Sequence, residues 1–217
     1  MIAHPDAALL VFAKAPIPGA VKTRLIPTLG AEAAARLQER LVHHTLSLAT
    51  SAALAPVELW CAPAAEHPFF EQCHRRYDVP LRDQQGHHLG ERMAYAFAET
   101  LKTRRYALLI GTDCPQLSAG DLKLSFELLA NGYRAVLGPA EDGGYVLVGL
   151  QTLAPSLFTD IGWETDQVLT QTREKLAALH LRWFELPTRW DVDRPADLAR
   201  LKQEQPTLYA ACSAKTV

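Results

Sequence analysis

Short apolar runs of strand length alternate with segments of helical periodicity along the whole chain, and this alternation constrains the fold more than any other feature. Strand-like runs are expected at residues 7–13, 57–61, 79–82, 106–110, 135–137, 145–150 and 182–186. Helical patterns separate most of them; in 31–53, Ala34, Leu37 and Leu41 recur at helical spacing. Nothing repeats and no linker interrupts the pattern. It predicts a single α/β domain over residues 1–204 with a mostly parallel sheet, followed by a surface tail over 205–217.

Composition narrows the class of partner. The chain has 217 residues, a net charge of −2 and 21% charged residues, which gives no reason to expect nucleic acid or an anionic membrane as a partner. Its four cysteines lack the short paired spacing of a zinc site and favour reduced thiols. No stretch approaches the roughly 20 apolar residues of a membrane span. We therefore expect a cytoplasmic protein, a monomer or a homodimer.

The first apolar run stops abruptly in a basic loop, residues 14–25. Its three cations are Lys14, Lys22 and Arg24. Pro18 and Gly19 restrict the shape of this loop. Because ligands of such sheets bind beyond the carboxyl ends of the strands, a stiff basic loop at this place predicts a phosphate-bearing ligand. The alternative is that the cations are simply solvated. The loop is not a Walker A motif, because no glycine directly precedes Lys22.

Carboxylates follow other predicted strands. They are Asp113, Asp142, Asp191 and Asp193. In an extended segment, Asp191 and Asp193 would project to the same side. Carboxylates opposite cations favour Mg²⁺ or Mn²⁺ bridging protein and phosphate oxygens. Each also has a simpler interpretation: Asp113 as a turn residue, Asp142 as part of an Asp-Gly hairpin, and the late pair as helix caps.

A series of motifs runs almost from end to end of the chain. They are residues 12–16 (FAKAP), 18–19 (PG), 21–25 (VKTRL), 85–86 (QG), 89–93 (LGERM), 111–115 (GTDCP), 138–140 (GPA), 142–145 (DGGY), Trp163 with Thr165, 191–193 (DVD) and 197–198 (DL). As a series, they resemble a bacterial family of small GT-A-type glycosyltransferase-like proteins, DUF2064, whose members are sometimes linked to arsenosugar biosynthesis.

The resemblance implies a nucleotide-diphospho-sugar transferase fold, a Rossmann-like three-layer sandwich. It implies that the nucleotide and its phosphates contact the basic loop and the Leu-Gly-Glu-Arg-Met motif, through Lys14, Pro18, Gly19, Lys22, Thr23, Arg24 and Gly90. It also implies Asp113 as the principal metal ligand, with Asp191 and Asp193 matching late carboxylates that hold metal in related guanylyltransferases. The chain departs from the common pattern because Cys114 and Pro115 follow Asp113, so no Asp-x-Asp stands at that strand end.

The predicted function is a metal-dependent transfer from a nucleotide-sugar donor to a small-molecule acceptor, with Asp113, Asp142 and Lys22 as catalytic residues. The acceptor side would be lined by Gly143, Gly144, Tyr145, Trp163 and Thr165. One alternative is nucleotidylyl transfer, in which an NTP and a phosphorylated acceptor release pyrophosphate, as with 2-phospholactate guanylyltransferase. A second alternative, from another class, is a non-catalytic nucleotide-binding module.

Overall fold

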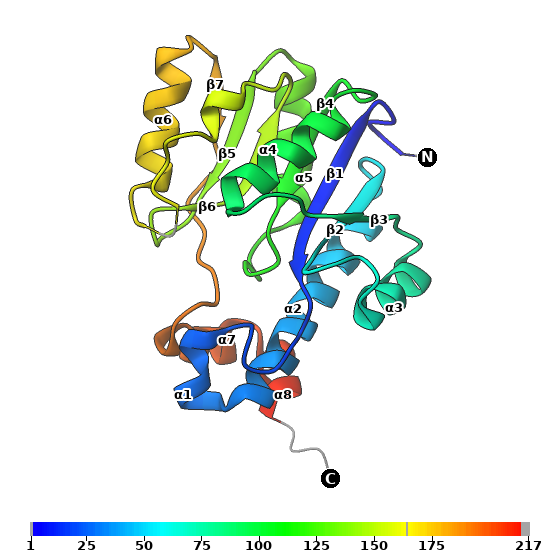
Figure 1. Cartoon of the computed structure of the whole chain (residues 1–217), viewed down its shortest axis with the longest axis vertical. Coiled ribbons are helices and arrows are strands. Elements are labelled where there is room, and N and C mark those ends of the chain that lie inside the picture. The colour runs from blue at the N-terminus through cyan, green and yellow to red at the C-terminus, as the bar shows by residue number, and fades with distance from the viewer. Residues whose placement is uncertain (1, 164, 214–217) are drawn as a thin grey trace.

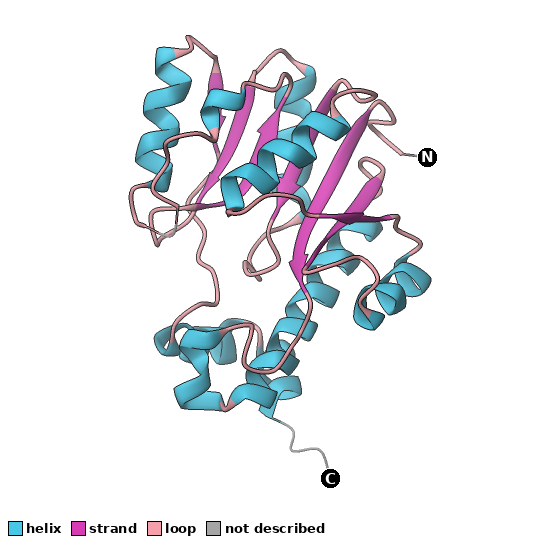
Figure 2. Cartoon of the chain, viewed as in Figure 1, coloured by secondary structure: helices cyan, strands magenta, loops and turns pink. Residues whose placement is uncertain are grey.

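A seven-stranded sheet with the order β3-β2-β1-β4-β6-β5-β7 forms the centre of the molecule and is drawn as magenta arrows in Figure 2. The computed structural model describes residues 2–163 and 165–213. The strands are β1 Ala7–Lys14, β2 Val57–Ala62, β3 Leu81–Asp83, β4 Tyr106–Ile110, β5 Ala135–Pro139, β6 Tyr145–Leu150 and β7 Trp183–Glu185. β6 runs antiparallel to β4 and β5, and the other pairings are parallel. The expectation of a mostly parallel sheet is confirmed.

Helices cover both faces of this sheet and make a three-layer sandwich. The α-helices are α1 Ile26–Leu29, α2 Ala31–Ser51, α3 Pro68–Tyr77, α4 Leu89–Thr100, α5 Ala119–Ala130, α6 Val168–Ala178, α7 Pro195–Glu204 and α8 Pro206–Ser213, with 3₁₀ helices η1 Thr23–Leu25 and η2 Pro155–Leu157. One core lies against α2, α3 and α5, the other against α4 and α6. Successive residues of β1 point to opposite faces, so Leu9 packs in the first core and Leu10 in the second.

A third, smaller cluster lies beyond the carboxyl ends of the parallel strands. It joins Leu25 of η1, Leu37 and Leu41 of α2, and Trp190 and Val192 of the segment after β7; residues of α7 complete it. In Figure 1 this helical group lies at the foot of the molecule, and the arrow of β1 points down toward it. The cluster therefore brings the basic loop and the Asp191–Asp193 segment, which are far apart in the sequence, to the same end of the sheet.

The helix ends in the structure agree only in part with those expected from the sequence. The spacing of Ser118 and Asp121 in the sequence predicts a capping box, and these residues form one at the start of α5. The sequence pattern also predicts a helix from about Thr165 to Leu179. α6 begins at Val168 instead, because the Thr165 hydroxyl donates a hydrogen bond of 2.6 Å to the carbonyl of Gly162 and closes a turn.

The last described residues form α8, where the sequence suggests a surface tail. Leu208 and Tyr209 of this helix pack against the third cluster. The division into a domain over 1–204 and a tail over 205–217 stays a prediction. None of the described helices is both long enough and apolar enough to cross a membrane.

Candidate active site at the strand ends

Lys22 is the most constrained residue of the basic loop. Its backbone adopts the left-handed conformation (φ 48°, ψ 40°), which costs a non-glycine residue about 1–2 kcal/mol. Its side chain is 3% exposed, and its Nζ lies 2.7 Å from Oδ1 of Asp113 and donates at 2.7 Å to the carbonyl of Val192. These two contacts hold the strained residue in place. The ammonium is buried at the centre of the site and is not solvated.

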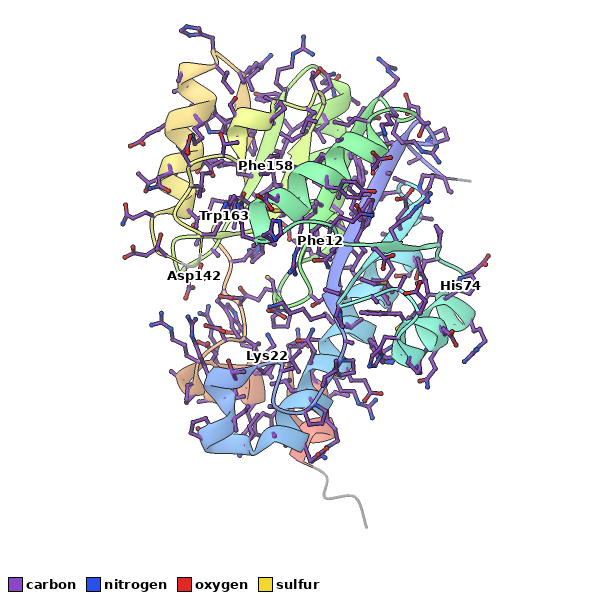
Figure 3. The ribbon with its side chains drawn as sticks, in the orientation of Figure 1. Phe12, Lys22, His74, Asp142, Phe158 and Trp163 are labelled. Atoms are coloured by element: carbon purple, nitrogen blue, oxygen red, sulfur yellow. The ribbon has the colours of Figure 1, made fainter. Side chains whose placement is uncertain are left out.

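Asp113 follows β4, and its backbone is held in place as well as its side chain. Its carbonyl accepts a hydrogen bond of 2.8 Å from the Val192 amide, while 47% of its side chain is exposed. The basic loop, the end of β4 and the segment after β7 are therefore joined through Lys22, Asp113 and Val192. Figure 3 shows Lys22 beside the lower helical group, with Asp142 above it near the end of the sheet.

A second ion pair joins the same loop to the same late segment. Nη1 of Arg24 contacts Oδ2 of Asp193. The helix-cap alternative for the late carboxylates does not hold, because the carboxylate that caps α7 is Asp197. It accepts from the amide of Asp193 at 3.0 Å and from that of Arg194 at 2.5 Å. Asp191 and Asp193 are therefore left for another role.

Asp191 lies among other carboxylates. Burial, followed by the negative charges of Asp142 and Asp113, raises its pKa to about 6, and Lys22 opposes this rise. Asp142 comes from the turn between β5 and β6. Asp113 and Asp142, from two other segments, thus act on Asp191 with like charge, and Lys22 is the cation that opposes them.

The Asp-Gly-Gly turn is shaped by contacts within the chain. Oδ1 of Asp142 accepts a hydrogen bond of 2.9 Å from the Gly144 amide, so Asp142 does act as a turn residue. It also lies near Asp191. Gly143 has φ +88°, and a Cβ there would lie 2.2 Å from the carbonyl oxygen of Asp166. The Gly143 carbonyl accepts a hydrogen bond of 2.8 Å from the Leu169 amide at the start of α6. Gly143 is therefore required for docking the turn on α6.

Tyr145 and Trp163, both expected on the acceptor side, occupy different environments. The Tyr145 hydroxyl is buried, and burial raises its pKa. Trp163 lies over the first turn of α4, where a Cβ on Gly90 would come within 2.3 Å of its Nε1, and it stacks on His88 with ring centroids 6.4 Å apart. The close approach of the Trp163 indole therefore explains why a glycine is needed at position 90. Sequence patterns did not reveal this contact. Thr165 lies exposed in the turn that precedes α6.

The other expected phosphate contacts are open to solvent. Lys14 lies at the end of β1 with its side chain exposed, and Pro18, Gly19 and Thr23 are exposed as well. The Lys14 carbonyl is held by Nε2 of Gln38 at 3.2 Å. The basic loop therefore has an anchored main chain and two kinds of cation: Lys14 faces solvent, whereas Lys22 is buried.

Sequence reasoning missed Arg189, which anchors the late segment. Its Nη2 donates a hydrogen bond of 2.7 Å to Oδ1 of Asp121 in α5, and its carbonyl accepts one of 2.9 Å from the Glu141 amide. Burial acts to raise the pKa of Asp121, but the hydrogen bonds from Arg189 and Ser118 outweigh it and lower that pKa. The capping box accounted for Asp121 locally, and nothing in the sequence pointed to a partner so distant in the chain.

The donor set at the strand ends fits a divalent cation that shares its shell with substrate. Within residues 2–163 and 165–213, no group of three or more His, Cys, Asp or Glu side chains is arranged to hold a metal ion. Mg²⁺ typically takes one or two carboxylates and completes its shell with water and phosphate oxygens. Asp113, with about half its side chain exposed, and the neighbouring Asp191 are the oxygen donors that such an arrangement needs.

The fold matches solved structures of one class, the nucleotide-diphospho-sugar transferase fold. A protein from Desulfovibrio desulfuricans G20, provisionally described as a nucleotide-diphospho-sugar transferase, is 29% identical with a TM-score of 0.84, and the match covers 95% of this chain and 94% of that one. A family model described as an uncharacterized protein conserved in bacteria, DUF2064, matches residues 45–165, and the chain belongs to that family.

More distant structures share the fold alone. The 4-diphosphocytidyl-2C-methyl-D-erythritol synthase of Anaerococcus prevotii is 10% identical with a TM-score of 0.58, covering 88% of this chain and 94% of that one. Glucosyl-3-phosphoglycerate synthase of Mycobacterium tuberculosis, solved with Mn²⁺, UDP and glucosyl-3-phosphoglycerate, is 10% identical with a TM-score of 0.55, covering 98% and 81%. No curated protein matches the sequence.

Proposed function

We propose that this protein is a metal-dependent transferase that uses a nucleotide-sugar donor to modify a small-molecule acceptor. The observation that carries the proposal is the contact of Lys22 with Asp113 at the carboxyl end of β4, near Asp191, which in turn lies near Asp142. Cations and carboxylates from separate segments converge where sheets of this kind bind nucleotides. The likeness to the Desulfovibrio protein supports the transferase class.

Asp113 and the neighbouring Asp191 would hold the metal, Mg²⁺ or Mn²⁺, and Asp193 would join them on leaving Arg24, with which it pairs in this structure. When bound, the cation would supply Lewis-acid stabilisation of the departing diphosphate. Lys14, Lys22 and Arg24 would neutralise the remaining phosphate charge, with Lys14 reaching it from solvent. The main chain around Pro18, Gly19 and Thr23 would shape this side of the pocket, as would Gly90 beneath Trp163.

Asp142 is suited to the acceptor. Its Oδ1 is held by the Gly144 amide, so the exposed carboxylate has a fixed orientation and keeps Oδ2 for an acceptor hydroxyl. It would orient that hydroxyl and take up its proton as the new bond forms. Trp163 and Thr165 belong to the facing segment before α6. Because the Tyr145 hydroxyl is buried, its expected role in acceptor binding draws no support from its position.

Nucleotidylyl transfer is the second candidate. Here an acceptor phosphate would attack the α-phosphorus of an NTP, and pyrophosphate would leave. The nearness of Asp191 to Asp113 favours this candidate, because two carboxylates can hold the metal ions of a two-metal site. The partners would in either case be a nucleotide and a small molecule. We expect a cytoplasmic monomer or homodimer that binds neither nucleic acid nor membrane.

The leaving group distinguishes these candidates. The protein is incubated with sugar nucleotides or NTPs, Mn²⁺ and a panel of acceptors, and the products are separated by ion-exchange chromatography. Release of a nucleoside diphosphate from a sugar nucleotide supports glycosyl transfer, whereas pyrophosphate from an NTP supports the second candidate.

Thermal shift with the same nucleotides tests the metal. We expect stabilisation that requires Mn²⁺ and disappears in Asp113→Asn. A nucleotide-dependent shift that needs no metal and persists in that variant would instead support the non-catalytic binding module. No shift with any nucleotide would contradict all three functions.

A further inference from the structure

Both Lys22 and Arg24 already hold a carboxylate from the opposite side of the site. Lys22 pairs with Asp113, and Arg24 pairs with Asp193. We call these contacts the two bridging ion pairs. Each joins a residue expected to bind phosphate to one expected to bind metal. In the ligand-free protein, the two halves of the site are therefore joined by contacts between opposite charges.

We propose that the two bridging ion pairs make the metal and the diphosphate bind as one coupled unit, because each pair must exchange its partner when both ligands arrive. Asp113 and Asp193 pass from Lys22 and Arg24 to the divalent cation, while Lys22 and Arg24 pass to phosphate oxygens. This inference rests on the proposed function. It adds a specific role for Lys22. In the ligand-free protein Lys22 is the counter-ion of Asp113, and it leaves Asp113 free for the metal only when a phosphate oxygen becomes its new partner.

The burial of Lys22 gives the coupling its physical basis. Its ammonium is directed at two oxygens, Oδ1 of Asp113 and the Val192 carbonyl, each at 2.7 Å, and only 3% of the side chain is exposed. A divalent cation that took Asp113 alone would remove the carboxylate in direct contact with this buried ammonium and place a second positive charge beside it. Breaking a buried pair by removing one partner is strongly unfavourable, because the remaining charge is not compensated.

The converse step is penalised as well. A diphosphate that drew Lys22 away without a metal would leave Asp113 without the cation it contacts and close to the carboxylate of Asp191. The phosphate would add further negative charge to the same place. When both ligands bind together, all four members of the two bridging ion pairs find new opposite partners, so each ligand raises the affinity for the other by the same factor.

The exposed pair contributes less. Arg24 and Asp193 lie closer to solvent than Lys22, and water screens their charges. The two pairs therefore differ in the strength with which they oppose a metal ion. This difference provides a graded test within one protein.

Mn²⁺ affinity of the whole protein without nucleotide tests the first half of the inference. Free Mn²⁺ is measured by electron paramagnetic resonance for the wild type, Lys22→Gln and Arg24→Gln, with Lys14→Gln as the matched control. Lys14 belongs to the same loop and carries the same charge, but its exposed ammonium makes no ion pair with any described residue. We expect Mn²⁺ affinity to rise about tenfold in Lys22→Gln and about two- to threefold in Arg24→Gln. It should change by less than about twofold in Lys14→Gln.

Nucleotide affinity tests the second half. Binding of CDP, UDP, GDP and ADP is measured by calorimetry with and without Mn²⁺. The factor by which Mn²⁺ strengthens binding should be at least about tenfold in the wild type and several-fold smaller in Lys22→Gln. Thermal unfolding checks that each variant is folded. If Lys22→Gln does not fold, the more exposed Arg24→Gln decides, and an unchanged Mn²⁺ affinity in that variant overturns the inference.

The outcomes separate this inference from the function on which it rests. If the wild type binds Mn²⁺ and nucleotide, but Lys22→Gln binds Mn²⁺ no more tightly, the coupling through Lys22 is wrong and the metal-dependent transferase stands. If neither protein binds Mn²⁺ with or without any of the nucleotides, the proposed metal site is wrong, and the inference falls with it.

Discussion

Replacing Gly143 by alanine would force the turn between β5 and β6 away from α6, and the loss of stability follows from two features of the backbone. At φ +88°, an alanine costs about 1–2 kcal/mol relative to glycine. Its Cβ would also lie 2.2 Å from the Asp166 carbonyl oxygen, a main-chain atom that can yield only if the loop moves. Such overpacking adds about 1–3 kcal/mol. We therefore expect Gly143→Ala to lower the free energy of unfolding by about 2–5 kcal/mol.

Gly132→Ala is the matched control for this change. Gly132 has nearly the same φ, +90°, but an added Cβ would meet nothing within 4 Å. The control should lose only the conformational part, about 1–2 kcal/mol. Urea unfolding followed by circular dichroism measures both variants against the wild type by linear extrapolation. If Gly143→Ala loses no more stability than Gly132→Ala, the close contact with Asp166 does not hold the turn and our reasoning is refuted.

Two further predictions concern the packing of the site. Leu25→Ala removes a fully buried side chain from the third cluster and should cost about 2–5 kcal/mol in urea unfolding; a loss below about 1 kcal/mol would mean that the cluster does not hold η1 in place. Asp121→Asn should cost about 1.5–3 kcal/mol at pH 7, because it removes the charged acceptor of Arg189. Since folding lowers the pKa of Asp121, its stabilisation is present above the unfolded value of 3.8 and is lost as the pH falls through the lower folded value. The difference between variant and wild type should shrink as the pH falls below about 4, and a difference that stays constant down to pH 2.5 would contradict the assignment.

The strands were predictable because their determinants are local. β4 Tyr106–Ile110 and β6 Tyr145–Leu150 match the expected ranges at both ends, since each is a compact apolar run with a glycine directly beyond one end. The capping box at Ser118 was equally local. The sequence suggested that Leu208 and Tyr209 of the tail dock on the domain, and they do pack against the third cluster. The helix α8 itself was not predicted, because that cluster is assembled from other segments of the chain.

For the site, the sequence alone determined which charges stand at the ends of strands, and the resemblance grouped them into phosphate-binding and metal-binding sets. Only the tertiary structure decided how those charges pair. The third cluster packs η1 against the segment after β7, and this contact brings Lys22 to Asp113 and Arg24 to Asp193. Ion pairs act through space and their strength depends on burial, so partners so distant in the chain leave no periodic pattern in a single sequence. The same physics explains Gly90 and Gly143, whose need for close contact with Trp163 and Asp166 exists only once the chain has folded.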